Sequence, residues 1–186
     1  ARNAIFQKMV ADIAQAALTT RGNVEAIRAA VFPGAGKSVE QHISEMVGSI
    51  GENMALRRSA VISVSEGAIA SYIHGAVTDG AGKIGVLVGL KSKGDRARLE
   101  ALGKQIAMHV AAARPLAGRV EELDPAVVKR ERDILFDQAR NSGKPDAIIE
   151  KMVDGRITKY LAEITLLGQP FVKDPEQTIE KLLAKK

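Results

Sequence analysis

Apolar residues recur at helical spacing near the start of the chain and again after a glycine-rich loop. The first stripe, with a residue at every fourth position, predicts an opening helix: Ile5, Met9, Ile13 and Ala17. The second stripe predicts another helix: Val39, Ile43, Met46, Val47 and Ile50. Ser38 precedes this second helix and Gln41 follows three residues later, which is the capping-box pattern of a helix start.

The spacing of apolar residues then changes to that of strands. Residues 60–64 form a short run rich in β-branched side chains. The side chains of residues 69–74 alternate between two faces, with Tyr72 and His74 on one of them. Because Gly67 lies between these two runs, we expect them to form a hairpin. Residues 84–90 alternate apolar residues with glycines, which predicts a strand packed closely on one face. The glycine-rich residues 78–82 mark the best lobe boundary.

Start and stop signals define helices in the second half. Asp95 is a predicted cap of a long helix that ends before Pro115. Asp124 followed by a proline starts another helix, and residues 141–145 form a sharp break before the next one. The apolar stripes on either side of this break favour an antiparallel two-helix coiled coil over residues 124–164. Asp174, again followed by a proline, predicts the cap of a final helix.

Composition restricts the chemistry. The 186 residues are 46% hydrophobic and contain no Cys, so neither a disulfide nor a Cys-based metal site can form. No apolar run approaches the length of a membrane span, so no membrane association is expected. The net charge of +5 permits nucleic-acid binding, but acidic and basic residues interleave over 129–133. This is the pattern of a solvated helix surface, so no direct nucleic-acid contact is expected.

Two sets of residues invite a catalytic interpretation. Residues 34–38 resemble the end of a phosphate-binding loop, but the first glycine that such a loop needs is replaced by Val31. A loop leading into a capped helix is favoured, with a nucleotide hydrolase using Lys37 and Ser38 as an alternative. No nucleophile lies near a base with an orienting group, so we expect no catalytic residue, no cofactor and no enzymatic activity.

The three histidines are not at metal-ligand spacing, so no metal site is expected. His42 and His109 lie beside helical stripes and are predicted to be partly buried or on the surface. His74 ends a predicted strand, where it is either a partner contact or a structural histidine.

Several strings together resemble the elongation factor Ts family over the whole chain. They are Ile50-Gly51-Glu52-Asn53, Tyr72-Ile73-His74-Gly75, Ile84-Gly85-Val86-Leu87-Val88, Ile106-Ala107-Met108-His109-Val110-Ala111-Ala112, Ser142-Gly143-Lys144-Pro145 and Leu167-Gly168-Gln169-Pro170-Phe171-Val172. The resemblance implies an α+β fold with two lobes, each a small antiparallel β-sheet packed with helices, and a protruding antiparallel helical hairpin. We assign residues 1–78 to the N-terminal core lobe and 79–186 to the C-terminal core lobe, with 124–164 as the inserted hairpin.

The resemblance also implies a function. Members of this family are guanine-nucleotide exchange factors of translation elongation: they bind elongation factor Tu in its GDP-bound and nucleotide-free states and promote GDP release. The expected contacts with elongation factor Tu are Ile50, Gly51, His74, Phe171, Val172, Lys173, Ala1 and Arg2. A bacterial cytoplasmic location is expected, with an organelle as the alternative. A homodimer through the hairpin is left open.

Some family features are not matched. Of the family motif Thr-Asp-Phe-Val-Ala-Arg-Asn, this sequence contains only Ala1-Arg2-Asn3, and the segment that follows residue 186 in the family is missing. An insertion also lies around residues 65–69. Because the Asp-Phe pair of the motif drives GDP release in the family, we expect this chain to exchange GDP poorly. The alternatives are a basic nucleic-acid-binding protein and a coiled-coil adaptor without exchange activity.

Overall fold

The computed structural model describes residues 3–141 and 143–185. Backbone contacts divide the chain into two compact units, Ala1–Lys104 and Gln105–Lys186. The described elements are helices and two two-stranded antiparallel sheets, which confirms the predicted α+β class.

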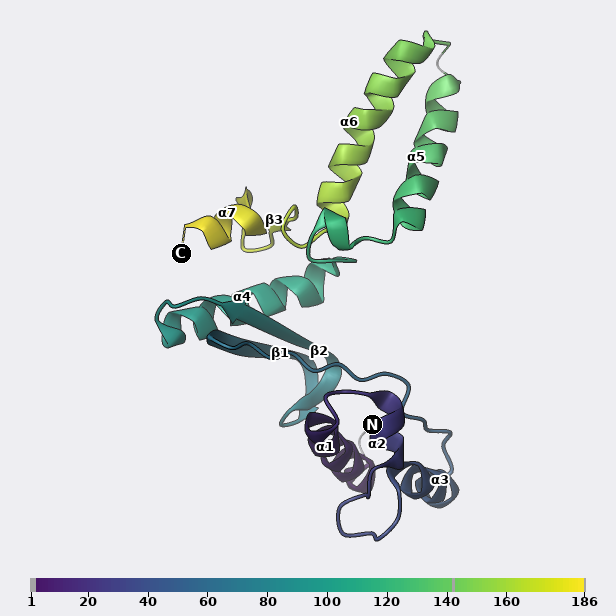
Figure 1. Cartoon of the computed structure of the whole chain (residues 1–186), viewed down its shortest axis with the longest axis vertical. Coiled ribbons are helices and arrows are strands. Elements are labelled where there is room, and N and C mark those ends of the chain that lie inside the picture. The colour runs from purple at the N-terminus through teal and green to yellow at the C-terminus, as the bar shows by residue number, and fades with distance from the viewer. Residues whose placement is uncertain (1–2, 142, 186) are drawn as a thin grey trace. The chain divides into compact units, whose positions relative to one another are not determined.

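The first unit opens with three helices that share a core (Figure 1). They are α1 (Ala4–Thr19), α2 (Val24–Ala29) and α3 (Val39–Ile50). Their buried residues form one cluster: Met9, Ile13, Ile27, Phe32, Val39 and Ile43. The predicted capping box is present, because the Ser38 side chain accepts from the Gln41 N–H and the Gln41 side chain accepts from the Ser38 N–H.

A long hairpin follows, made of β1 (Gly67–Thr78) and β2 (Ala81–Lys91). The predicted pairing of residues 60–64 with 69–74 is wrong, because β1 pairs with β2, with His74 opposite Ile84. The Asp-Gly sequence at 79–80 is a strong hairpin signal, and Gly80 adopts a φ of 71° in this turn. This turn lies within residues 78–82, which the sequence marked as the boundary between lobes. The division into lobes at 78/79 stays a prediction.

The glycines of β2 allow close packing, as the sequence predicted. A Cβ atom at Gly89 would lie 2.8 Å from the Ile62 Cγ2 and 3.1 Å from the Val64 Cγ1. Residues 60–64 thus cover this face of the hairpin instead of joining its ladder. The ensuing helix α4 (Arg96–Ala113) begins as predicted, with the Arg98 N–H donating to the Asp95 carboxylate at 2.9 Å.

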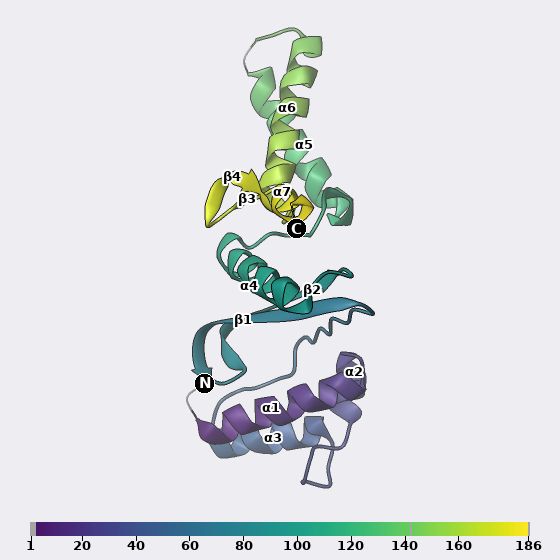
Figure 2. The same cartoon turned by 90° about the vertical axis from the view of Figure 1, so that its left-hand side faces the viewer.

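In the second unit, helices α5 (Pro125–Arg140) and α6 (Asp146–Ile164) follow the short 3₁₀ helix η1 (Val120–Glu122). Both views show α5 and α6 side by side as a hairpin (Figure 2). Ala139, Ile149 and Val153 form its buried cluster, against which Leu135 and Phe136 pack. Regular coiled-coil packing along the whole hairpin stays a prediction.

The last elements are β3 (Pro170–Phe171), β4 (Asp174–Thr178) and α7 (Ile179–Ala184). The prediction that Asp174 caps the final helix is wrong. Asp174 pairs with Phe171 in the small sheet, and the Thr178 side chain caps α7 by accepting from the Lys181 N–H at 3.3 Å. The proline after Asp174 lies in a strand of a two-stranded sheet, an edge position that tolerates a missing N–H.

Candidate partner-binding surface

The predicted contacts Ile50 and Gly51 lie where α3 ends. Gly51 adopts a left-handed φ of 77°, and its N–H donates to the Val47 carbonyl at 2.9 Å. Ile50 is half-buried and Gly51 is exposed. Because glycine enters this conformation without steric cost, the chain leaves the helix abruptly and keeps the helix end accessible.

His74 lies on β1 with its side chain exposed. Its Nδ1 is 3.3 Å from the Tyr72 hydroxyl, and the two ring centroids are 6.2 Å apart. The two side chains share a face, as the alternation predicted. The imidazole is therefore held from one side while the rest remains open to solvent, an arrangement in which a partner can reach it.

Phe171, Val172 and Lys173 form the tip of the small β3–β4 sheet. Phe171 is buried with 4% of its surface exposed, whereas the neighbouring Val172 is 47% exposed. Lys173 is also exposed, and it adds a positive charge beside this apolar side chain. The tip thus combines a buried anchor with an apolar and a charged side chain open to solvent.

A buried histidine lies directly behind this tip. His109 is 0% exposed, so the prediction that it is partly buried or on the surface is wrong. Its Nδ1 accepts from the Val172 N–H at 3.3 Å, its Nε2 is 3.0 Å from the Gln169 Oε1, and its ring lies 6.1 Å from that of Phe171. Gln169 was not among the predicted contacts. The signal that could have found the histidine is its spacing of three residues from Ile106, which places it on the buried stripe of α4.

The predicted contacts are divided between the two compact units. Ile50, Gly51 and His74 belong to the first unit, and the tip at 171–173 belongs to the second. Ala1 and Arg2 lie outside the described residues.

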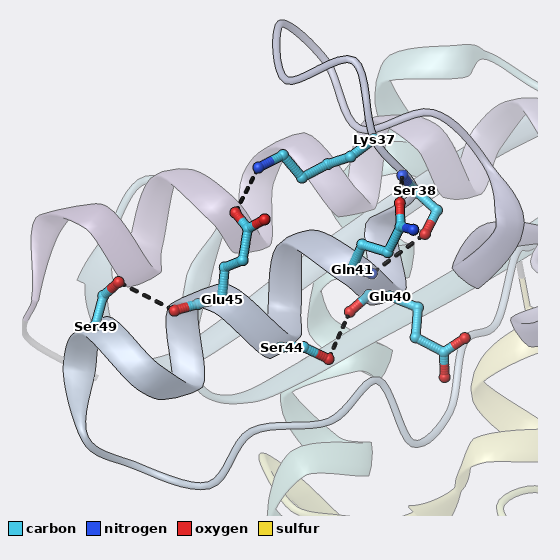
Figure 3. Close-up of polar contacts among 7 residues, drawn as sticks. All are labelled: Lys37, Ser38, Glu40, Gln41, Ser44, Glu45 and Ser49. Atoms are coloured by element: carbon cyan, nitrogen blue, oxygen red, sulfur yellow. Dashed lines mark hydrogen bonds and ion pairs between the residues drawn. The ribbon is translucent and has the colours of Figure 1, made fainter.

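The loop that resembles a phosphate-binding motif has its polar groups engaged elsewhere (Figure 3). The Lys37 ammonium pairs with the Glu45 carboxylate at 2.5 Å. The Ser38 hydroxyl oxygen caps α3, and the segment before the loop is the helix α2 where a phosphate-binding loop needs a strand. This geometry favours a connection into a capped helix over a nucleotide site.

The remaining charged groups fit a surface role. Among the described residues, five lysines and arginines pair with a carboxylate one helical turn away: Lys8–Asp12, Arg28–Glu25, Arg96–Glu100, Lys129–Asp133 and Lys159–Glu163. Within residues 3–141 and 143–185, no cluster of three His, Asp or Glu side chains is arranged to hold a metal ion. Across the same ranges, no helix has the length and apolar content to cross a membrane.

Comparison with known proteins assigns the family. A family model described as elongation factor TS matches residues 1–186. The chain belongs to the elongation factor Ts family. It is 58% identical over 181 residues to elongation factor Ts of Parvibaculum lavamentivorans, covering 97% of this chain and 59% of that relative. It is 55% identical over 179 residues to elongation factor Ts of Agrobacterium fabrum, covering 96% of this chain and 58% of that relative. The chain therefore spans somewhat less than three-fifths of the length of these relatives.

Proposed function

We propose that this chain binds elongation factor Tu and acts in guanine-nucleotide exchange during translation elongation. The observation that carries the proposal is the family match over residues 1–186. The activity requires no covalent chemistry, only a difference in affinity between the nucleotide-bound and the empty GTPase. The bacterial cytoplasmic location follows from the proposed partner, not from a feature of the chain.

The proposed contacts are the α3 end and His74 in the first unit and, separately, the tip at 171–173 in the second. These elements have the character of interface anchors, since each presents an accessible side chain or backbone on an ordered element. An exposed apolar residue beside a buried aromatic is especially suited to this role, because binding removes apolar area from water without reordering the anchor.

Val172 offers the sharpest test. Replacing Val172 with Ala removes exposed apolar surface and leaves the loop backbone in place. If the tip is a contact, we expect binding to elongation factor Tu to weaken about fivefold or more, which corresponds to about 1 kcal/mol for an interface residue. Calorimetry or fluorescence anisotropy with the nucleotide-free GTPase measures this directly.

Val120→Ala is the matched control. Val120 lies in the same unit and is 41% exposed, close to the 47% of Val172, but it lies in η1 outside the proposed surface. Its replacement should leave the affinity within about twofold. Equal weakening by both substitutions would contradict a specific role for the tip, and no binding by the unmodified chain would contradict the proposed function.

A further inference from the structure

The loop between β3 and β4 has an unfavourable sequence for its length. Phe171 pairs with Asp174, so only Val172 and Lys173 connect the two strands. Two-residue hairpin loops favour turns with positive φ, usually supplied by glycine or asparagine. Neither loop residue adopts a positive φ here. The conformation of this loop therefore needs support from outside the hairpin.

That support is a chain of hydrogen bonds that begins at two helix carbonyls. The Gln169 amide nitrogen donates to the Glu163 carbonyl at 2.8 Å and to the Ala113 carbonyl at 3.4 Å. These two hydrogen bonds, donated by the Gln169 nitrogen, fix the orientation of the amide, so the Gln169 oxygen faces His109 as an acceptor.

The orientation of Gln169 determines the tautomer of His109. Because the Gln169 oxygen can only accept, the Nε2 of His109 must carry a hydrogen and donate it. In the neutral ring the Nδ1 is then an acceptor, which is what the N–H of Val172 requires at 3.3 Å. Every polar atom of this buried network has a partner, so the network specifies one arrangement.

We propose that His109 and Gln169 are positioning residues that preform the tip at 171–173 for contact with elongation factor Tu. This inference rests on the proposed function for its partner. Both residues are buried, with 0% and 6% of their surfaces exposed, so they act through the loop and do not touch the partner. By tying the Val172 backbone to α4, they keep Val172 outward and Phe171 inward before binding. A preformed loop pays less ordering entropy on association.

Two substitutions at His109 separate the hydrogen bonds. His109→Asn places its side-chain oxygen near the position of Nδ1 and retains an acceptor for the Val172 N–H, but it cannot reach Gln169. His109→Gln retains a donor near the position of Nε2 for Gln169 and loses the acceptor for Val172. Both remove the ring beside Phe171, so both lose similar packing. A purely structural role predicts equal effects on binding, whereas positioning predicts that His109→Asn binds more tightly.

The first measurement uses the unmodified 186-residue chain alone. Nitrogen-15 NMR of the histidine ring should show the neutral tautomer with hydrogen on Nε2, and the Val172 amide should exchange slowly with solvent. Hydrogen on Nδ1, or a rapidly exchanging Val172 amide, would overturn the positioning role. This measurement decides the proposal even if both variants fail to fold.

The second measurement is the affinity of each variant for nucleotide-free elongation factor Tu, compared with its thermal stability. We expect His109→Asn to bind about fivefold more tightly than His109→Gln, the factor that one neutral hydrogen bond typically contributes. Equal affinities, or the reverse order, would overturn the inference. If the unmodified chain does not bind, the proposed function fails together with the partner named here, while the NMR result separately decides whether His109 holds the loop.

Discussion

Two glycines near the end of α3 should respond in opposite directions to the same substitution. Gly48 lies inside α3, and Gly51 caps its end with a φ of 77°. A Cβ atom added at either position meets no atom within 4 Å, so packing contributes to neither change. The substitutions Gly48→Ala and Gly51→Ala therefore report only how the backbone conformation contributes to the free energy of unfolding.

The magnitudes follow from the two conformations. Alanine at Gly48 loses less conformational freedom on folding, which should raise the free energy of unfolding by about 0.5–1 kcal/mol. Alanine at Gly51 must adopt the left-handed conformation at a cost of roughly 1–2 kcal/mol, partly offset by the same entropic gain. We expect Gly51→Ala to lower the free energy of unfolding by about 1 kcal/mol, so that the variants differ by about 2 kcal/mol.

Native-state hydrogen exchange of the α3 amides is the appropriate assay. The chain has two compact units, and a global unfolding curve need not follow a two-state transition. Exchange reports the opening of the first unit alone. A change of the same sign in both variants would refute the conformational argument, which requires alanine to be favoured over glycine at Gly48 and disfavoured at Gly51.

Three further substitutions test other parts of the structure. Gly67→Ala should destabilise the first unit by roughly 3 kcal/mol or more, since its Cβ would lie 1.9 Å from a carbonyl oxygen of β2, and loss of amide protection in β1 would show this. Ile149→Ala should lower the unfolding free energy of the second unit by about 2–5 kcal/mol, measured by hydrogen exchange of the α5 and α6 amides, because this side chain is only 2% exposed. The control Ile148→Ala, at a residue 47% exposed, should change it by less than about 0.5 kcal/mol, and equal losses would contradict the described hairpin face. Asp124→Ala should cost about 1 kcal/mol in the same exchange measurement, because it removes the acceptor of the Ala126 N–H at 2.8 Å, and unchanged protection of the α5 amides would rule out that cap.

Local signals predicted most helices well. The starts of α3, α4 and α5 each follow a side-chain cap that is visible in the sequence, at Ser38, Asp95 and Asp124. Such caps accept hydrogen bonds from N–H groups within the same turn. They can therefore be predicted without information about the rest of the fold. The exception was Asp174, where pairing with Phe171 in a strand took precedence over its capping propensity.

Features that depend on distant residues could not be predicted in the same way. The partner of β1 was misassigned because residues 60–64 have strand-like composition yet lie over Gly89 of β2 without joining the ladder. The network behind the tip joins His109 to Gln169, which are 60 residues apart in the chain. No local pattern specifies that contact, and the sequence therefore indicated the tip at 171–173 but not the side chains that hold it.

The central claim is that this chain binds elongation factor Tu and that binding is coupled to the nucleotide. If the factor lowers the affinity of the GTPase for GDP, then GDP must lower the affinity of the GTPase for the factor by the same ratio. The most direct measurement is the affinity of the chain for elongation factor Tu, first without nucleotide and then with saturating GDP. Because this chain is expected to exchange GDP poorly, we predict that GDP reduces the affinity by roughly fivefold, the low end of the usual range of such coupling. Binding of equal strength in both conditions, or no binding in either, would contradict the account.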